Sequence, residues 1–262
     1  MAKFQSLRAT YTSSVSLCLG GTCPLSFAKP IQVTERFMNL PLQIRHLVTT
    51  VALLAAAGLH AAQAVPDAPN KVAPLSVGAA APSQVLPSAD GPFDLGRALR
   101  DKPTVLIFYR GNWCSLGKDA LAEFQREIPF LQALGYQVIA ISTDTPESLK
   151  PAAEKFQVSY LLLSDHDLSL SSAYGISFRA SKDLENDYAR KGITLATFPG
   201  QNRPAGLLVP TVFIVDTNGI VRWVFSNPKR NPSTSELIAA ASKAHRAIAS
   251  QANIRTSFAS QP

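Results

Sequence analysis

The hydrophobic pattern of the chain changes its period at a single cysteine, and this change restricts the folds that the chain can form. Residues 104–109 are a continuous run of apolar and β-branched residues without a helical period, which predicts a buried strand. After Cys114, apolar residues recur at steps of three and four, which predicts a helix with one apolar face. The residues of that face are Leu116, Ala120, Leu121, Phe124, Ile128 and Leu131. A cysteine therefore sits where a buried strand gives way to a helix.

The start of a helix favours an anion at Cys114. The N–H groups of a first turn lack intrahelical partners, and the aligned peptide dipoles place partial positive charge there. Free cysteine has a pKa of about 8.5, and such a setting lowers it to between roughly 3.5 and 7.5. Arg110, four residues earlier, is a second source of positive charge. The pattern favours a reactive thiolate, although buried cysteines that serve only packing are also common.

Strands and helices alternate along the rest of the chain, which indicates an α/β fold with a mixed central β-sheet flanked by helices. The run of Ile220 to Phe225 follows an Asn-Gly pair, which is a strong hairpin signal. In order, the sequence predicts a short strand and turn at 77–95, a strand at 136–143, a helix at 145–156, a strand at 160–164, a short helix at 168–174, strands at 209–216 and 220–225, and a helix at 235–249.

Residues 178–208 are the least regular part of this pattern. A polar helix is predicted at 181–191, ended by Gly192, and a loop follows at 198–204. The segment is interpreted either as a gate for a substrate or as a solvated insertion.

The stretch Phe-Tyr-Arg-Gly-Asn-Trp-Cys at 108–114 resembles the active-site stretch of the peroxiredoxin-like branch of the thioredoxin-fold proteins, the alkyl hydroperoxide reductase and thiol-specific antioxidant (AhpC/TSA) family. The resemblance covers residues 76–249. It implies a thioredoxin-like fold and a thiol-dependent peroxidase that needs no cofactor. In that family a proline before a late strand, here Pro210, faces the active-site cysteine.

This resemblance also implies which residues form the site. Cys114 would be the nucleophile, and Arg110 would donate hydrogen bonds to the departing oxygen, unless it forms a surface ion pair or caps the strand end instead. Trp113 would either shield the pocket or serve packing alone. The expected pocket residues are Tyr109, Gly111, Trp113, Val209 and Pro210.

Three departures from the family pattern weaken the peroxidase interpretation. Gly117 stands where the branch commonly has a second cysteine, Gly111 stands where the wider family has Thr or Ser, and Pro210 lies near the place of a family arginine. Arg179 and Arg222 are candidate substitutes for that arginine. Without a second thiol, Cys114 needs an external thiol to resolve its oxidised form.

The leading interpretation is a single-cysteine peroxidase that reduces hydrogen peroxide or organic hydroperoxides, with an external thiol or thioredoxin-like protein as reductant. The alternatives are a monothiol disulfide-exchange protein and a thioredoxin-fold binding domain without redox activity. The family resemblance also allows a homodimer. His166 and His245 are the only histidines after residue 64, and neither forms a spaced pair with another His or Cys, so no metal site is expected.

An export signal is predicted near the start of the chain. The apolar stretch 47–59 follows Arg45 and precedes Ala62-Gln63-Ala64, which is the layout of a secretory signal peptide cleaved after Ala64. It is shorter than the roughly 20 apolar residues that span a bilayer, so no stable membrane insertion is expected after cleavage. Counted from Met38 the signal has ordinary length, which predicts that Met38 is the true start; the alternative is a disordered cytoplasmic extension.

Removal of residues 1–64 changes the charge and the cysteine content. The net charge falls from +7 to +3, since those residues hold five of the 25 Lys and Arg and one of the 18 Asp and Glu. The basic character is thus weak evidence for a nucleic-acid partner, and none is expected. Cys18 and Cys23 are lost, so Cys114 remains the only thiol in a periplasmic or secreted protein.

The sequence therefore predicts one folded domain with flanking segments. These are an upstream extension at 1–37, the signal peptide at 38–64, a Pro- and Ala-rich linker at 65–75, a thioredoxin- or peroxiredoxin-like domain at 76–249, and a flexible tail at 250–262.

Overall fold

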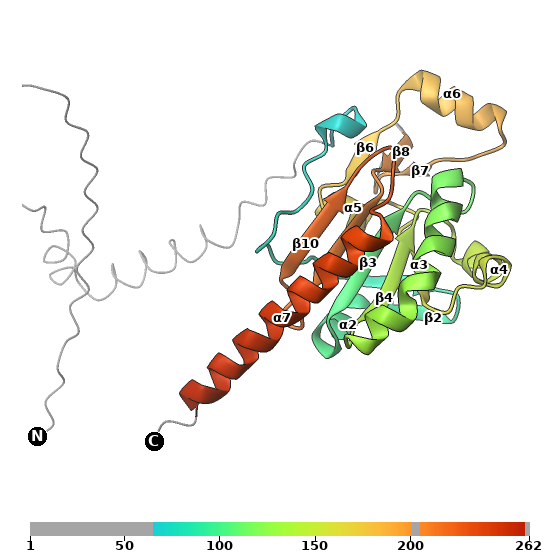
Figure 1. The fold of residues 1–262 in the computed structure, drawn as a ribbon. Helices are drawn as coiled ribbons and strands as arrows, with labels where there is room; N and C mark the ends of the chain where they lie inside the picture. Colours follow the sequence, from blue (N-terminus) through green and yellow to red (C-terminus); the bar gives the residue numbers. More distant parts are fainter. Residues whose placement is uncertain (1–64, 201–204, 260–262) are drawn as a thin grey trace, which may run out of the picture. The chain divides into compact units, whose positions relative to one another are not determined.

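Parallel and antiparallel strands combine in one seven-stranded sheet (Figure 1). The computed structural model describes residues 65–200 and 205–259. The strand order is β10-β9-β3-β4-β5-β1-β2, in which β3, β4 and β5 are parallel to one another and the other pairs are antiparallel. The strands are β1 (Val85–Ser88), β2 (Gly91–Asp94), β3 (Thr104–Tyr109), β4 (Gln137–Ser142), β5 (Leu161–Ser164), β9 (Thr211–Val215) and β10 (Val221–Ser226). The predicted leader at 38–64 and the extension at 1–37 lie outside the described residues.

Helices cover both faces of this sheet, and the central strand β3 is therefore buried on both sides. Val105, Ile107 and Tyr109 pack into a cluster with α3 (Ser115–Ala133), α4 (Pro146–Phe156) and α7 (Thr234–Ala259). Leu106 and Phe108 point to the opposite face, as the two-residue period of a strand requires, and pack with α2 (Leu95–Asp101) and α5 (Ser169–Ala173). The predicted α/β fold with a mixed, helix-flanked sheet is confirmed.

The irregular segment at 178–208 contains a second, three-stranded sheet. Its order is β6 (Ser177–Arg179), β8 (Ala205–Leu208), β7 (Ala196–Thr197), and the predicted polar helix is present as α6 (Lys182–Arg190). A separate apolar cluster holds this part together, with Phe178, Leu207 and Val209 among its buried members. Residues 201–204 of the predicted loop lie outside the described residues.

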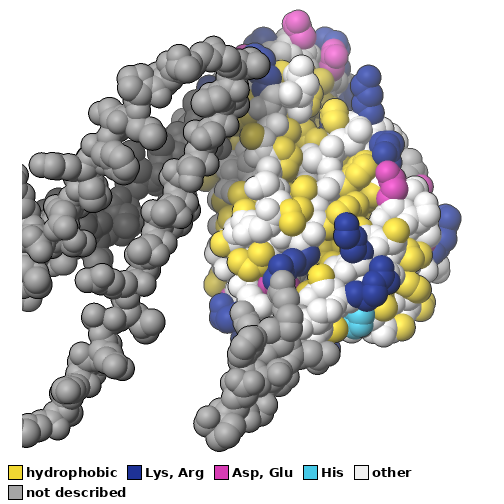
Figure 2. Space-filling model, turned by 60° about the vertical axis from the view of Figure 1, so that its left-hand side comes forward, with side chains coloured by type: hydrophobic (Ala, Val, Ile, Leu, Met, Phe, Trp, Pro, Cys, Tyr) yellow, Lys and Arg dark blue, Asp and Glu magenta, His cyan; other side chains and the backbone are white. Residues whose placement is uncertain are grey.

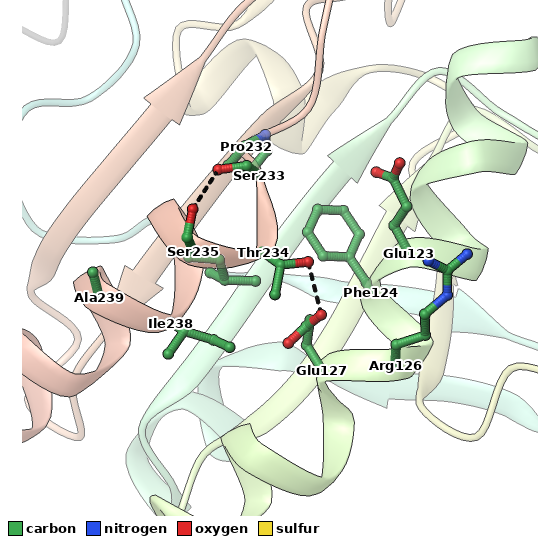
Figure 3. Close-up of a pocket in the computed structure, with 11 residues that line it drawn as sticks. Glu123, Phe124, Arg126, Glu127, Pro232, Ser233, Thr234, Ser235, Ile238 and Ala239 are labelled. Carbon is green, nitrogen blue, oxygen red and sulfur yellow. Dashed lines mark hydrogen bonds between the residues drawn. The ribbon is translucent and has the colours of Figure 1, made fainter.

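Helix α7 packs along α3 on one face of the sheet (Figure 3). Leu237 and Ala241 belong to the same cluster as Phe124 of α3. At the start of α7, the Thr234 hydroxyl donates a hydrogen bond of 2.8 Å to the largely buried carboxylate of Glu127. Helix α7 is therefore joined to α3 by both apolar and polar contacts.

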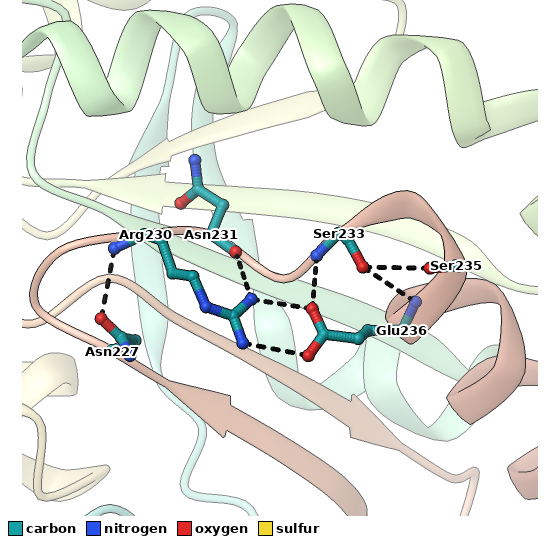
Figure 4. Close-up of polar contacts among 6 residues, drawn as sticks. All are labelled: Asn227, Arg230, Asn231, Ser233, Ser235 and Glu236. Carbon is teal, nitrogen blue, oxygen red and sulfur yellow. Dashed lines mark hydrogen bonds and ion pairs between the residues drawn. The ribbon is translucent and has the colours of Figure 1, made fainter.

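A reciprocal capping box fixes the first turn of α7 (Figure 4). The Glu236 N–H donates to the Ser233 hydroxyl at 3.3 Å, and the Ser233 N–H donates to Glu236 Oε2 at 2.8 Å. Arg230 donates to both carboxylate oxygens of Glu236, at 2.8 and 3.0 Å. The helix thus begins one residue before the predicted start and runs to Ala259, through most of the segment 250–262 for which the sequence predicts a flexible tail. No Gly or Pro interrupts residues 234–259, so nothing in the backbone chemistry ends the helix earlier.

The capping box predicts a loss of stability in acid. The hydrogen bonds from Arg230 and Ser233 lower the pKa of Glu236 to about 2, below the value of about 4.3 expected in the unfolded chain. The stabilisation is therefore complete above a pH of about 4.3 and disappears as the pH falls towards 2. In thermal melts, Glu236→Gln should flatten this part of the pH profile, whereas Glu154→Gln, on the exposed side of α4, should leave it unchanged. Equal profiles for wild type and Glu236→Gln would contradict the prediction.

Large hydrophobic side chains are mostly covered. Within the described residues the exposed ones are Val77, Val85 and Phe130. On the face shown in Figure 2, apolar side chains are interspersed with polar and positively charged ones. No helix within residues 65–200 and 205–259 combines the length and the apolar character needed to cross a bilayer.

Candidate active site

Cys114 is the residue immediately before α3, as the change of period predicts. Its backbone is extended, with φ −93° and ψ 130°, and its carbonyl accepts hydrogen bonds from the N–H groups of Gly117 and Lys118, each at 3.1 Å. The side chain is half-buried and forms no disulfide, and it makes no capping hydrogen bond to the first turn. Cys114 is therefore a partly exposed residue at the positive end of the helix.

The turn after β4 holds the loop that leads to Cys114. The Thr143 hydroxyl donates to the Arg110 carbonyl at 2.6 Å, and the Asn112 N–H donates to both carboxylate oxygens of Asp144, at 3.1 and 3.0 Å. The Ser142 hydroxyl donates to the same carboxylate at 2.9 Å. Sequence reasoning missed Asp144, although a Ser-Thr-Asp turn after a strand parallel to β3 must lie at the same edge of the sheet as Cys114.

Burial shapes the electrostatics below this loop. Asp144 is 7% exposed, and burial raises its pKa, although the hydrogen bonds from Ser142 and the Asn112 N–H oppose the shift. The pKa of Tyr109 is also raised, first by burial and then by the nearby Asp144 carboxylate. The Tyr109 hydroxyl is buried without a hydrogen-bond partner among the described residues. Tyr109 thus lies beneath the loop, where it packs rather than lines an open pocket.

Arg110 joins the loop to the segment before Pro210. Its Nε donates to the Leu208 carbonyl and its Nη2 to the Pro228 carbonyl, each at 3.4 Å. These contacts match the capping alternative, in which the guanidinium satisfies backbone carbonyls. The catalytic role of Arg110 stays a prediction.

Trp113 and Val209 lie in one apolar cluster, so the structure brings the two predicted pocket segments together. The Trp113 ring meets the Tyr188 ring of α6 edge-to-face, with centroids 5.0 Å apart. Pro210 is buried, and its carbonyl accepts a hydrogen bond from the Asn227 N–H at 3.2 Å. The inserted segment therefore packs against the residue next to Cys114 and is more than a solvated loop.

Loss of the Tyr188 ring is expected to loosen Trp113. Tyr188→Leu should lower the free energy of unfolding by about 1 kcal/mol, since it removes an edge-to-face pair. It should also increase acrylamide quenching of Trp113 fluorescence, measured in a Trp223→Phe background because the chain has two Trp residues. Tyr188→Phe keeps the ring and should behave like wild type. Equal quenching in Tyr188→Leu and Tyr188→Phe would refute this role.

The two candidate substitute arginines differ in their position relative to the Cys114 loop. Arg222 pairs with Asp216 just beyond β9, and the register places neighbouring Val215 opposite Thr104, at the start of β3. Cys114 follows the other end of β3, about 16 Å away along the strand, so the suggestion for Arg222 was wrong. Arg179 lies in β6, where its N–H donates to the Pro66 carbonyl at 2.7 Å.

Both glycines that depart from the family pattern occupy places without room for a side chain. Gly111 has φ +140°, and a Cβ there would lie 2.6 Å from Trp113 Nε1 and 2.7 Å from Asp144 Oδ1. A Cβ at Gly117 would lie 2.6 Å from the Gly111 carbonyl oxygen. Neither the Thr nor the second cysteine of the family pattern would fit this loop without a shift of neighbouring atoms.

A large groove lies apart from this loop. It has a volume of about 740 Å³ and runs between α3 and α7 (Figure 3), where Glu123, Arg126 and Ile238 are among its lining residues. None of the lining residues belongs to the Cys114 loop or to the Val209-Pro210 segment. Within the described residues, no three His, Cys, Asp or Glu side chains are grouped so that they could hold a metal ion.

Sequence relatives support the resemblance noted above. The chain is 26% identical to the chloroplastic peroxiredoxin Q of Gentiana triflora over 155 residues, which cover 59% of this chain and 61% of that protein. It is 27% identical to peroxiredoxin Bcp of Escherichia coli strain K12 over 159 residues, which cover 60% of this chain and 88% of that protein. The chain thus spans about three fifths of the length of the plant relative.

Solved structures show the same fold. Reduced Prx3 from Vibrio vulnificus in complex with H2O2 superposes with a TM-score of 0.52 at 18% identity, over 65% of this chain and 98% of that one. A peroxiredoxin-like protein from Aquifex aeolicus gives a TM-score of 0.50 at 22% identity, over 66% and 89% of the two chains. The model of the AhpC/TSA family matches residues 77–224, a stretch that includes Cys114 and Pro210 and more than half of the 262 residues. The chain therefore belongs to the AhpC/TSA family.

Proposed function

We propose that the chain is an exported, single-cysteine thiol peroxidase that reduces hydrogen peroxide or organic hydroperoxides. The observation that carries this proposal is the free, half-buried Cys114 at the start of α3 in a chain of the AhpC/TSA family. A helix start stabilises a thiolate, and partial exposure lets a peroxide reach it. The named relatives are peroxiredoxins, which supports the same chemistry here.

The reaction proceeds in two stages. The Cys114 thiolate forms a bond to one peroxide oxygen while the O–O bond breaks, and the leaving oxygen takes a proton to give water or an alcohol. Cys114 is then a sulfenic acid. An external thiol condenses with it to form a mixed disulfide and water, and a second external thiol releases Cys114 and leaves with the first as a disulfide. Within the described residues Cys114 is the one cysteine, which supports resolution by an outside partner.

Stopped-flow oxidation by peroxide tests this proposal. Purified protein that carries Cys18→Ser and Cys23→Ser, so that Cys114 is its one thiol, should react with hydrogen peroxide or cumene hydroperoxide much faster than free cysteine does, with one equivalent of sulfenic acid formed. Cys114→Ser should abolish the reaction. A rate no higher than that of free cysteine for both peroxides would reject the peroxidase function.

The monothiol-exchange alternative predicts a different outcome. Mixed disulfides would then form with partner proteins from an export-compartment extract, in wild type and not in Cys114→Ser, without rapid oxidation by peroxide. A redox-inactive binding domain is favoured by the missing second cysteine, where Gly117 stands, and by Gly111. It predicts a Cys114 alkylation rate whose pH dependence matches that of free cysteine.

Export is proposed from the predicted signal peptide alone. Residues 38–64 carry the signal-like pattern. Mass spectrometry of the native mature protein should find an N-terminus at Val65. An N-terminus before Met38 would overturn both the proposed start and the proposed signal.

A further inference from the structure

We propose that Asp144 is a positioning residue for the Cys114 thiol, a role that rests on the peroxidase function proposed above. Its carboxylate holds the backbone of the loop between β3 and α3, and the loop in turn fixes where α3 begins. The inference comes from contacts of Asp144 that no feature of the cysteine motif itself predicts.

The carboxylate acts on the loop through the backbone. Both oxygens of Asp144 accept from the Asn112 N–H, at 3.1 and 3.0 Å. One step further along, the Cys114 N–H donates to the Gly111 carbonyl at 3.2 Å. A displacement of the peptide between residues 111 and 112 therefore moves Cys114 directly.

Asp144 is itself held in place, as a positioning residue must be. The hydroxyl of Ser142 donates to its Oδ2 at 2.9 Å, and the hydroxyl of Ser164 donates to its backbone carbonyl at 2.6 Å. Both serines are buried at the ends of the parallel strands β4 and β5. The carboxylate thus transmits the geometry of the rigid sheet to the loop.

The loop is also shaped to receive the carboxylate. Gly111 has φ +140°, and the position of its missing Cβ is 2.7 Å from Asp144 Oδ1. A side chain at 111 would occupy the space through which the carboxylate reaches the Asn112 N–H. The close approach of Asp144 to the loop therefore depends on the absence of a side chain at Gly111.

Asp165 supplies a matched control. It is 1% exposed and follows β5 as Asp144 follows β4, and its carboxylate accepts from the N–H groups of Leu170 and Ser171 at 2.9 and 2.8 Å. Those contacts hold α5 and not the Cys114 loop. Asp165→Asn therefore reproduces the loss of a buried, hydrogen-bonded carboxylate without touching the cysteine.

The test compares Asp144→Ala, Asp144→Asn and Asp165→Asn in the full-length protein with Cys18→Ser and Cys23→Ser, so that Cys114 is the one thiol that reacts with peroxide or iodoacetamide. Amide exchange of Asn112, followed by NMR, should be at least about tenfold faster in Asp144→Ala. The peroxide rate constant should fall at least about tenfold, because misplacement of a reacting group has effects of this size, while alkylation by iodoacetamide falls less than about threefold. Asn keeps one oxygen acceptor, so Asp144→Asn should be intermediate, and it serves as the second variant if the Ala variant does not fold.

Three results would overturn the inference. Asn112 exchange could be unchanged in both Asp144 variants, Asp165→Asn could accelerate it equally, or peroxide and iodoacetamide rates could fall by the same factor, as a general loss of thiol reactivity predicts. A wild-type protein that does not react with peroxide would instead refute the proposed function, and the Asn112 exchange rates would still decide whether Asp144 holds the loop.

Discussion

Gly111→Thr, which restores a residue type common in the family at this position, is expected to lower the free energy of unfolding by about 3 to 5 kcal/mol. Two costs add. A β-branched residue is strained at φ +140°, and its Cβ would overlap Trp113 Nε1 at 2.6 Å and Asp144 Oδ1 at 2.7 Å. The loop would have to move away from Asp144, so peroxide reduction should fall rather than improve.

Urea denaturation checks this prediction, with Gly135→Thr as the control. Gly135 also has a positive φ, +81°, but nothing lies within 4 Å of the place its Cβ would take. The control should lose only the strain contribution, about 1 to 3 kcal/mol. Equal losses in the two variants would show that the space around Gly111 has no effect on stability.

Gly117→Ala is expected to destabilise the protein by about 2 kcal/mol. The sign is unusual, because Ala in place of Gly within a helix ordinarily stabilises by about 0.5 to 1 kcal/mol. At position 117 the added Cβ would lie 2.6 Å from the Gly111 carbonyl oxygen and 3.2 Å from the Tyr109 ring. A backbone oxygen cannot rotate away as a side chain can, so the first turn of α3 must shift.

Gly96→Ala in α2 is the control for this helical substitution. The atoms near a Cβ at Gly96 are the side-chain ends of Ser83, Asp94 and Arg100, which can move. Its free energy of unfolding should stay within about 1 kcal/mol of wild type. The prediction for Gly117 fails if both variants are equally stable. Gly117→Cys should likewise be destabilised.

The strongly periodic parts of the fold could be predicted from the sequence. The run at 104–109 and the stripe after Cys114 correspond to β3 and α3, because a strand buried on both faces and an amphipathic helix each leave a clear pattern. The short helix α2 and the strands of the second sheet were missed. They span two to seven residues, which is too short for a period to show.

The candidate site was predictable only in part. Cys114 and Trp113 follow from the local motif, and the contact of Trp113 with the Val209 cluster agrees with the resemblance. Asp144 was missed because its place beside the Cys114 loop depends on the parallel pairing of β3 with β4, which cannot be read from the sequence directly. Arg222 was suggested on sequence position alone. The antiparallel register of β9 places it near the start of β3, at the opposite end of that strand from Cys114.

The close approach of position 117 to the Gly111 carbonyl makes the two sites epistatic. A second cysteine introduced at 117 meets the Gly111 carbonyl oxygen, and a threonine introduced at 111 meets the side chains of Trp113 and Asp144. Each change made alone is therefore expected to destabilise the protein. Introduction of a second cysteine at 117 is expected to be better tolerated when the β3–α3 connection is altered with it.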